Sequence, residues 1–335
     1  MRAIRQHAFG GPEVLRYETV PDPEPGPGQV RIAARAIGVH LLDTVFRSGD
    51  RDRLPYDPPE PPTTPGRETA GIVDAVGEGV DPAWIGRRVV AHLGPAAGGY
   101  AERAVRDLTA VHALPEDVGF EQAVAMIGTG RTALMVLEVG PVTSEDVVIV
   151  PAAAGGIGTL LVQAAKRAGA RVVGLAGGPV KTAQVTANGA DAAVDYRADD
   201  WTDRLDHALD HVLDSAPGGR EATLLYDSVG GDVGRATLER LGPGARMIVF
   251  GWSSGRATDV SVDDIVGRSL TVSSALGPSL IARMGGLRRL ETRALEELAA
   301  GRLAPAVHTF ALADAGEAHR ALEHRETSGK VVLLP

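Results

Sequence analysis

The stretch that most constrains the fold runs from Val147 to Gly158, where a β-branched apolar run meets a proline, three alanines and a cluster of glycines. A segment with amphipathic spacing follows, at 159–169. This order predicts a strand, a tight turn and a helix. Ala153, Gly155 and Gly158 take the first, third and sixth places of the dinucleotide fingerprint, with alanine in place of its first glycine. A turn without side chains lets backbone N–H groups approach a pyrophosphate at a helix N-terminus.

A membrane span is the alternative interpretation of this stretch. Residues 147–165 contain only one strongly polar side chain, Gln163. Pro151 and the glycine cluster argue against a span, and the flanking sequence continues the alternation of strands and helices. We therefore expect no membrane segment.

The length and charge of the chain limit the classes of protein it can belong to. Its 335 residues suffice for two domains of ordinary size. The net charge of −9, without any run of basic residues, disfavours a nucleic-acid-binding protein. The absence of cysteine excludes disulfides and cysteine-ligated zinc. Residues 1–5 lack an apolar signal core, so a cytoplasmic protein is the expectation.

Short apolar segments separated by glycine and proline fill the first third of the chain and predict a compact β-barrel-like module. Residues 50–65 contain six prolines, which predicts a loop, either bordering a substrate entrance or without a role. The predicted strands of this module are 30–38, 71–77, 87–91 and 99–105.

From Val147 onward, strands and helices alternate regularly, which predicts an α/β domain with a doubly wound parallel sheet covered on both faces. Ligands of such sheets bind outside the carboxyl ends of the strands. A last strand at 329–334 has no evident partner in the tail, so we expect it to return to the first module. The further predicted strands are 171–176, 192–195, 222–227, 244–250 and 269–274, and the predicted helices are 180–188, 199–213, 232–241, 287–300 and 314–324.

The end of the second strand bears on the choice of cofactor. NAD enzymes usually carry an acid there for the ribose 2′-hydroxyl, whereas this chain has Ala176-Gly177-Gly178. Small residues leave room for a 2′-phosphate, and Lys181 supplies charge in the next helix. A solvated surface role is the alternative for Lys181. We favour NADPH, with Tyr196 and Arg197 flanking the adenosine.

With these residues collected, the chain resembles the zinc-independent medium-chain dehydrogenase/reductases, in the NADPH:quinone oxidoreductase and zeta-crystallin branch. The resemblance covers essentially the whole chain in order. The motifs that carry it are residues 38–49, 65–73, 98–101, 130–133, 152–158, 226–230, 250–255 and 325–333.

The resemblance implies a Rossmann domain at 122–277 and a GroES-like β-barrel domain at 1–121 completed by 278–335, with NADPH in the cleft between them. It also implies a homodimer through the strand from Leu270 to Ser274. The implied cofactor residues are Gly155, Gly156 and Ile157 at the pyrophosphate, Lys181 and Tyr196 at the adenosine phosphate end, Ser228 beside the adenosine half, Thr132, Phe250, Gly251 and Trp252 at the nicotinamide side, His40 near the nicotinamide ribose, and Arg325.

The chain also departs from its relatives. Zinc-dependent members carry a histidine where this chain has Arg67, before the structural Glu68, so no metal site is expected. A tyrosine linked to the quinone branch falls at Val45, which weakens the case for a quinone as the true substrate.

What remains is hydride transfer from NADPH to a quinone or to an α,β-unsaturated carbonyl, whose enolate needs a hydrogen-bond donor and a proton. His40 or a water is the candidate donor, or His40 only orients the ribose. Asp43 is the next candidate, or it caps a helix. An enoyl-thioester reductase is an alternative, and a non-catalytic NADPH-binding protein is an alternative of another class.

Overall fold

The computed structural model describes residues 1–53, 57–94, 98–213 and 221–335. It divides into two compact units, one made of Met1–Gly130 with Glu291–Pro335 and the other of Arg131–Leu290. Both divisions come later in the chain than the boundaries at 121/122 and 277/278 that the resemblance implies. The first difference arises because the segment after 121 is apolar and buries Val124 and Ile127 in a core cluster of the first unit.

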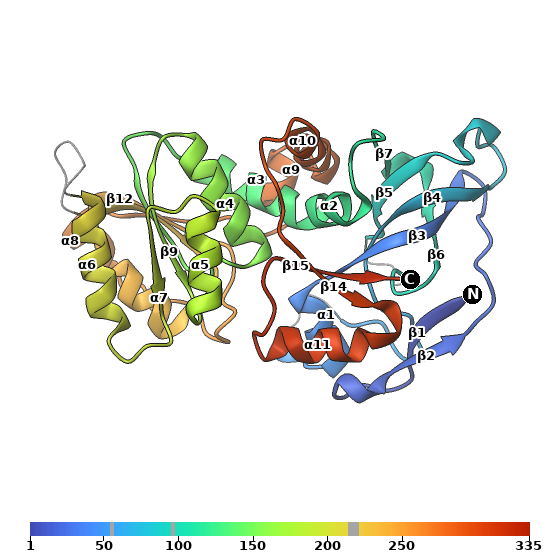
Figure 1. Cartoon of the computed structure of the whole chain (residues 1–335), viewed down its shortest axis with the longest axis horizontal. Coiled ribbons are helices and arrows are strands. Elements are labelled where there is room, and N and C mark those ends of the chain that lie inside the picture. The colour runs from blue at the N-terminus through green and yellow to red at the C-terminus, as the bar shows by residue number, and fades with distance from the viewer. Residues whose placement is uncertain (54–56, 95–97, 214–220) are drawn as a thin grey trace. The chain divides into compact units, whose positions relative to one another are not determined.

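The second unit is built on a six-stranded sheet with strand order β10-β9-β8-β11-β12-β13, in which every neighbouring pair is parallel. Strands β9 and β12 of this sheet are labelled in Figure 1. All four residues of β8 are buried, as expected for a strand covered on both faces. The expected parallel sheet is thus confirmed. Its strands are β8 (Val147–Val150), β9 (Arg171–Ala176), β10 (Ala192–Asp195), β11 (Ala222–Asp227), β12 (Leu241–Val249) and β13 (Thr271–Ser274).

Helices connect these strands. Leu205 and Leu209 of α6 pack with Ile149 and Val173 of the sheet in one apolar cluster. The stretch considered as a membrane span is instead divided between β8 and α4, and no described helix is both long and apolar enough to cross a bilayer. The helices are α3 (Arg131–Val139), α4 (Gly156–Arg167), α5 (Pro179–Ala187), α6 (Trp201–Leu213), α7 (Gly231–Leu238), α8 (Val262–Arg268), α9 (Pro278–Arg283) and α10 (Leu287–Ala299), the last of which crosses into the first unit.

The first unit contains a seven-stranded sheet with the order β14-β15-β3-β4-β5-β7, in which β6 also pairs with β3, and a separate pair β1-β2. Its strands are β1 (Arg2–Gln6), β2 (Leu15–Thr19), β3 (Gln29–Val39), β4 (Glu68–Val76), β5 (Arg88–His92), β6 (Arg103–Asp107), β7 (Val111–Ala113), β14 (Val307–Ala311) and β15 (Lys330–Leu334). Its helices are α1 (Leu41–Ser48), α2 (Phe120–Ala125) and α11 (Ala315–Glu323), with a π-helical turn at Met126–Gly130.

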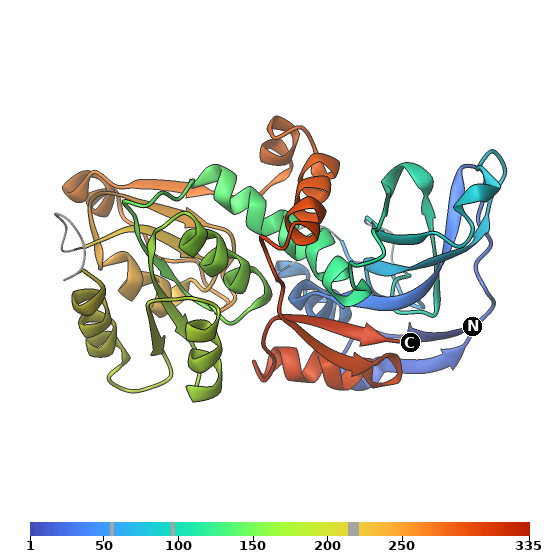
Figure 2. The same ribbon diagram turned by 45° about the horizontal axis from the view of Figure 1, so that its top comes forward.

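The C-terminal strand returns to the first module as expected, because β15 pairs antiparallel with β3. The expectation that it has no partner within the tail was wrong, since β15 also pairs in parallel with β14. Helices α11 and α1, from opposite ends of the chain, lie side by side (Figure 2). In the proline-rich segment the described residues form a short 3-10 turn at Arg51–Arg53 and a bridge between Thr63 and Gln6, whereas 54–56 lie outside the described residues.

Candidate functional site

The carboxyl-terminal edge of the parallel sheet gathers most of the predicted cofactor residues of the second unit. They follow the strands β8 to β12, so the strand order sets their order in space. The strand order reverses between β8 and β11, which is where ligands of such sheets bind. Along the edge from β10 to β12 lie Tyr196, Gly177, Gly155, Ser228 and Phe250.

The turn between β8 and α4 has the close packing that the fingerprint requires. Gly155 is the N-cap of α4, and Gly156 and Ile157 open the helix. A Cβ on Gly158 would lie 2.4 Å from the carbonyl oxygen of Ala152, so only glycine fits there. The first N–H groups of a helix have no partner within it, and they face outward with the positive end of the helix dipole. The turn is therefore suited to hold a pyrophosphate.

The end of β9 is free of acid and bordered by basic groups. The side chain of Arg197 lies over Gly177, where an added Cβ would come within 2.8 Å of its Cδ and 3.5 Å of the Tyr196 ring. Lys181 is the third residue of α5 and is half-buried. The Asp195 carboxylate lies at the same end of the sheet, where its Oδ1 accepts hydrogen bonds from the backbone N–H groups of Gly178 and Arg197.

The ends of β11 and β12 are joined to each other. The carboxylate of Asp227 is buried and accepts from the N–H groups of Val229 and Gly230, which fixes the turn that presents Ser228. The N–H of Ser253 donates to the carbonyl of Ser228 at 2.9 Å. In the same loop after β12, Phe250 is buried, Gly251 is half-buried and the Trp252 side chain is half exposed.

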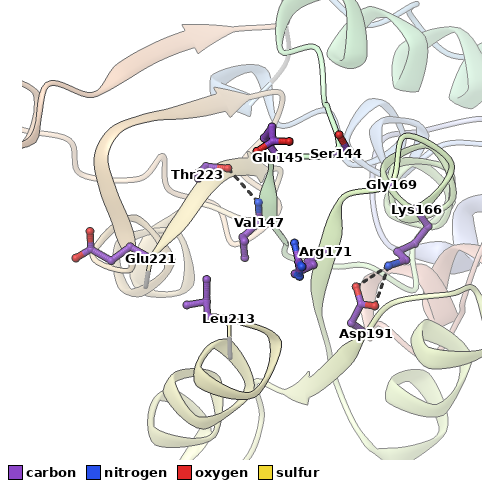
Figure 3. Close-up of a pocket in the computed structure, with 10 residues that line it drawn as sticks. All are labelled: Ser144, Glu145, Val147, Lys166, Gly169, Arg171, Asp191, Leu213, Glu221 and Thr223. Atoms are coloured by element: carbon purple, nitrogen blue, oxygen red, sulfur yellow. Dashed lines mark hydrogen bonds and ion pairs between the residues drawn. The ribbon is translucent and has the colours of Figure 1, made fainter. Parts of the chain in front are cut away.

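A pocket of about 430 Å³ lies at the opposite edge of this sheet, at the amino ends of β8, β9 and β11 (Figure 3). Two of its charged side chains are paired with each other, since Lys166 Nζ lies 2.8 Å from both carboxylate oxygens of Asp191. It contains none of the predicted cofactor residues. Its lining is Ser144, Glu145, Val147, Lys166, Gly169, Arg171, Asp191, Leu213, Glu221 and Thr223.

In the first unit, His40 and Asp43 stand at the start of α1. His40 is the N-cap residue and its side chain is 23% exposed. Asp43 is buried, and its Oδ2 accepts from the backbone N–H of His40 at 2.8 Å and from the Tyr100 hydroxyl at 3.1 Å. Its Oδ1 lies 3.4 Å from Arg67 Nε. Of the two roles considered for Asp43, the structure shows the helix cap.

The carboxylate of Glu68 lies beside His40 and is fully buried. His40 Nε2 lies 2.7 Å from Oε1, and Lys330 Nζ lies 2.8 Å from Oε2. Two glycines make room for it, because a Cβ on Gly38 or on Gly128 would lie 2.1 Å or 1.7 Å from a carboxylate oxygen. Burial raises the pKa of Glu68, but the neighbouring His40 and Lys330 hold that pKa well below its ordinary value. Burial lowers the pKa of His40, against the pull of Glu68.

A second buried chain of hydrogen bonds continues from Asp43 to α11. The Tyr100 hydroxyl lies 2.9 Å from His319 Nε2, and His319 Nδ1 lies 3.3 Å from an Arg47 nitrogen. Arginine can only donate, so Nδ1 accepts, Nε2–H donates to Tyr100, and Tyr100 donates to Asp43. Arg47 also pairs with Glu323 at 2.6 Å. Burial lowers the pKa of His319 to about 4, so this imidazole is neutral at neutral pH.

Sequence reasoning missed most of this network. Lys330, Tyr100 and His319 come from distant parts of the chain, and only the register of the sheet brings Lys330 to Glu68. The remaining predicted residues are Thr132, the second residue of α3, and Arg325, an exposed residue after α11 with a φ of 58°. Within the described ranges, no three His, Cys, Asp or Glu side chains are grouped to hold a metal ion.

Comparison with known proteins agrees with this architecture. The family model for the alcohol dehydrogenase GroES-like domain matches residues 26–116, which confirms the GroES-like expectation. The model for zinc-binding dehydrogenases matches residues 156–293.

Among curated proteins, the quinone oxidoreductase of Pseudomonas aeruginosa is 33% identical over 337 residues, with 100% of this chain and 99% of that protein covered. The 2-haloacrylate reductase of a Burkholderia species is 31% identical, with 98% and 97% covered. The crystal structure of Escherichia coli quinone oxidoreductase complexed with NADPH superposes with a TM-score of 0.83 at 32% identity, over the full length of both chains. This chain therefore belongs to the medium-chain dehydrogenase/reductases, as an oxidoreductase of the quinone oxidoreductase branch.

Proposed function

We propose that the protein is an NADPH-dependent reductase that transfers hydride to a quinone or to an electron-poor C=C bond conjugated to a carbonyl. The observation that carries the cofactor choice is the end of β9. Ala176 and Gly177 replace the acid that would bind a ribose 2′-hydroxyl, and Arg197 lies over Gly177. A 2′-phosphate suits this surface, because Arg197 and Lys181 supply cationic donors and the nearby Asp195 carboxylate is already engaged by the N–H groups of Gly178 and Arg197.

The residues of the sheet edge have distinct roles in this proposal. The N–H groups at the start of α4 bind the pyrophosphate, and Lys181 with Arg197 binds the 2′-phosphate. Tyr196 packs against the adenosine, and the Ser228 hydroxyl donates or accepts nearby. Phe250, Gly251 and Trp252 border the nicotinamide. Bound NADPH supplies the hydride, so the chain contributes mainly orientation, which is worth up to ~7–11 kcal/mol when reactants are well aligned.

The residues do not fit a catalytic zinc. Arg67 occupies the place of the ligand histidine of zinc-dependent relatives, and the chain has no cysteine. The Arg67 guanidinium lies instead near Asp43 and over the Phe46 ring at 5.1 Å. We therefore assign no step to a metal ion. The oxygen of the substrate must be stabilised by hydrogen bonds, from the protein or from water.

The relatives and the residue at position 45 both bear on the choice between a quinone and a conjugated C=C bond. Relatives named quinone oxidoreductase favour a quinone, whereas the 2-haloacrylate reductase favours an activated C=C bond. Val45 is buried and brings no hydroxyl to the position where the quinone branch carries a tyrosine. This favours the conjugated C=C bond. Enoyl thioesters belong to the same chemical class.

We also propose a homodimer through β13. This strand is at the edge of its sheet and pairs only with β12, so its outer side offers free backbone donors and acceptors among the described strands. A second copy could extend the sheet there. Sedimentation velocity should show a dimer, and the double substitution Thr271→Lys with Ser273→Lys should shift it to monomer. A monomeric wild-type protein at micromolar concentration would refute the dimer.

The test of the function is steady-state oxidation of NADPH and of NADH with a panel of quinones, enones, haloacrylates and enoyl thioesters. We expect turnover with NADPH on at least one class and much weaker turnover with NADH. Tight NADPH binding without turnover on any class would favour a non-catalytic NADPH-binding protein. Equal use of the two cofactors would contradict the assignment of the 2′-phosphate site.

A further inference from the structure

The register of the first unit places Glu68, Lys330 and His40 on one face of its sheet, around Gly38. Gly38 of β3 is paired with Glu68 of β4 on one side and with Val332 of β15 on the other. Side chains alternate along a strand, so Lys330 shares the face of Val332. His40 follows β3 by one residue and lies two positions after Gly38, on that same face. Because Gly38 has no side chain, the Glu68 carboxylate occupies the space between His40 and Lys330.

The contact between His40 and Glu68 determines which ring nitrogen carries the proton. An ionised carboxylate has acceptors only, and its Oε1 is 2.7 Å from His40 Nε2. The negative charge at that distance favours a proton on Nε2, because a lone pair there would face the carboxylate. In a neutral ring Nδ1 then has the lone pair and can only accept a hydrogen bond.

The surrounding charges keep the ring neutral. Glu68 is already balanced by Lys330 at 2.8 Å, and Asp43 is balanced by Arg67 at 3.4 Å. These are the charged groups that face His40 from α1, β4 and β15. A proton added to His40 would leave an excess positive charge in a buried region, which is costly.

We propose that Glu68 and Lys330 are positioning residues that hold His40 as a neutral imidazole protonated on Nε2, so that His40 acts as a hydrogen-bond acceptor and not as a proton donor. One consequence rests on the proposed function: His40 then accepts a hydrogen bond from a hydroxyl such as that of the ribose. The proton that completes reduction of the substrate then comes from water or from another group.

The direct test is a ¹⁵N–¹H correlation spectrum of the full-length protein labelled at histidine nitrogens, recorded at neutral pH without cofactor or substrate. The His40→Asn variant assigns the His40 signals. His319 is an internal reference, because its contacts with Arg47 and Tyr100 require the same tautomer. We expect His40 with a protonated Nε2 and a bare Nδ1. A protonated Nδ1, in a neutral or a charged ring, would overturn the proposal whether or not the protein reduces any substrate.

The role of Lys330 is tested by Lys330→Met, which removes the balancing charge. The titration midpoint of His40 should move to higher pH, with a charged ring appearing near neutrality, and Lys330→Arg should restore the wild-type midpoint. An unchanged midpoint in folded Lys330→Met would show that Lys330 does not position His40. If that variant does not fold, the charge-balanced pair Glu68→Gln with Lys330→Met serves instead, and it should lose the strict preference for protonated Nε2. A retained preference would contradict the role of Glu68.

The kinetic readout separates positioning from proton donation. His40→Asn should raise the KM for NADPH several-fold with little change in kcat, and the pH profile of kcat should keep its shape. Loss of kcat by orders of magnitude, together with loss of a limb of that profile, would identify His40 as the proton donor and would refute the inference.

Discussion

Lys330 Nζ lies 2.8 Å from Glu68 Oε2, although the strands β15 and β4 that hold these two residues are not neighbours in the sheet. Strand β3 separates them, and the absence of a side chain at Gly38 lets the two groups meet across it. Both groups are almost completely buried. The last strand of the chain is thus joined to the first module by charge as well as by the hydrogen bonds of the sheet.

Breaking this pair should destabilise the first unit. Lys330→Met leaves the Glu68 carboxylate buried without its cation, a change that costs roughly 3–5 kcal/mol of unfolding free energy. The double variant Glu68→Gln with Lys330→Met should recover most of that loss, because no unbalanced charge remains. Urea unfolding followed by Trp84, with Trp201 and Trp252 replaced by Phe, reports on this unit. Equal stability of wild type and the single variant would contradict the expected contribution.

A second prediction follows from the tight packing around the Glu68 carboxylate. Gly128→Ala would place a Cβ 1.7 Å from Oε1, so the carboxylate or the π-helical turn must shift. We expect a loss of ~1–3 kcal/mol from overpacking. Gly267→Ala is the matched control, because a Cβ there, in the exposed helix α8, meets nothing within 4 Å. That variant should be neutral or slightly stabilising, by less than ~1 kcal/mol. Similar effects of the two substitutions on the urea midpoint would contradict tight packing of Gly128 against the Glu68 carboxylate.

The stability of the first unit should fall between pH 7 and pH 5 because of His319. Its folded-state pKa of about 4 is below the ordinary value of 6.5, so in this range the unfolded chain binds a proton that the folded chain does not. Stability is therefore complete above pH 6.5 and is lost as the pH falls toward 4, by roughly 2 kcal/mol between pH 7 and pH 5. His40 contributes a loss of the same sign, because its pKa is also lowered.

The measurement is the urea midpoint of wild type and of His319→Gln at the two pH values. The variant lacks the titrating ring, so the difference between its two midpoints should be smaller than in wild type. The buried carboxylates do not interfere, because the lowered pKa values of Glu68 and Asp43 place their effects at more acidic pH. Parallel behaviour of the two proteins would exclude His319 as the source of the acid sensitivity.

The second unit could be predicted from the sequence in more detail than the first. The predicted strands 171–176, 192–195 and 222–227 coincide with β9, β10 and β11, because each is a short, mainly apolar run bounded by turn residues. In the first unit the strand expected at 99–105 begins only at Arg103. The segment before it turns back against Pro65 and Gly66, with backbone hydrogen bonds from Gly99 and Tyr100 that no local pattern announces.

The candidate site also contains residues that the sequence predicts and residues that it does not. Gly155 and its neighbours could be predicted because the fingerprint is local in sequence. The partners of His40 could not, since Glu68 and Lys330 are brought together by sheet register, and Lys330 is far from both in sequence. β14 was missed because its five residues mix polar and apolar types, none of them is buried, and the strand is defined by its pairing with β15.

The last prediction concerns the 2′-phosphate. Arg197→Ala removes the cation over Gly177, and Lys181→Ala removes the cation in the first turn of α5. A hydrogen bond to a charged group is worth roughly 1.5–3 kcal/mol. Each variant should therefore raise the KM for NADPH by about 10- to 100-fold, since ~1.4 kcal/mol is a factor of ten, and leave the KM for NADH nearly unchanged. Arg171→Ala is the control, because Arg171 opens β9 at the opposite edge of the sheet and lines the pocket there. It should change neither constant. A rise in both cofactor constants for Lys181→Ala would show a general structural effect, and no rise in either for both test variants would place the 2′-phosphate elsewhere.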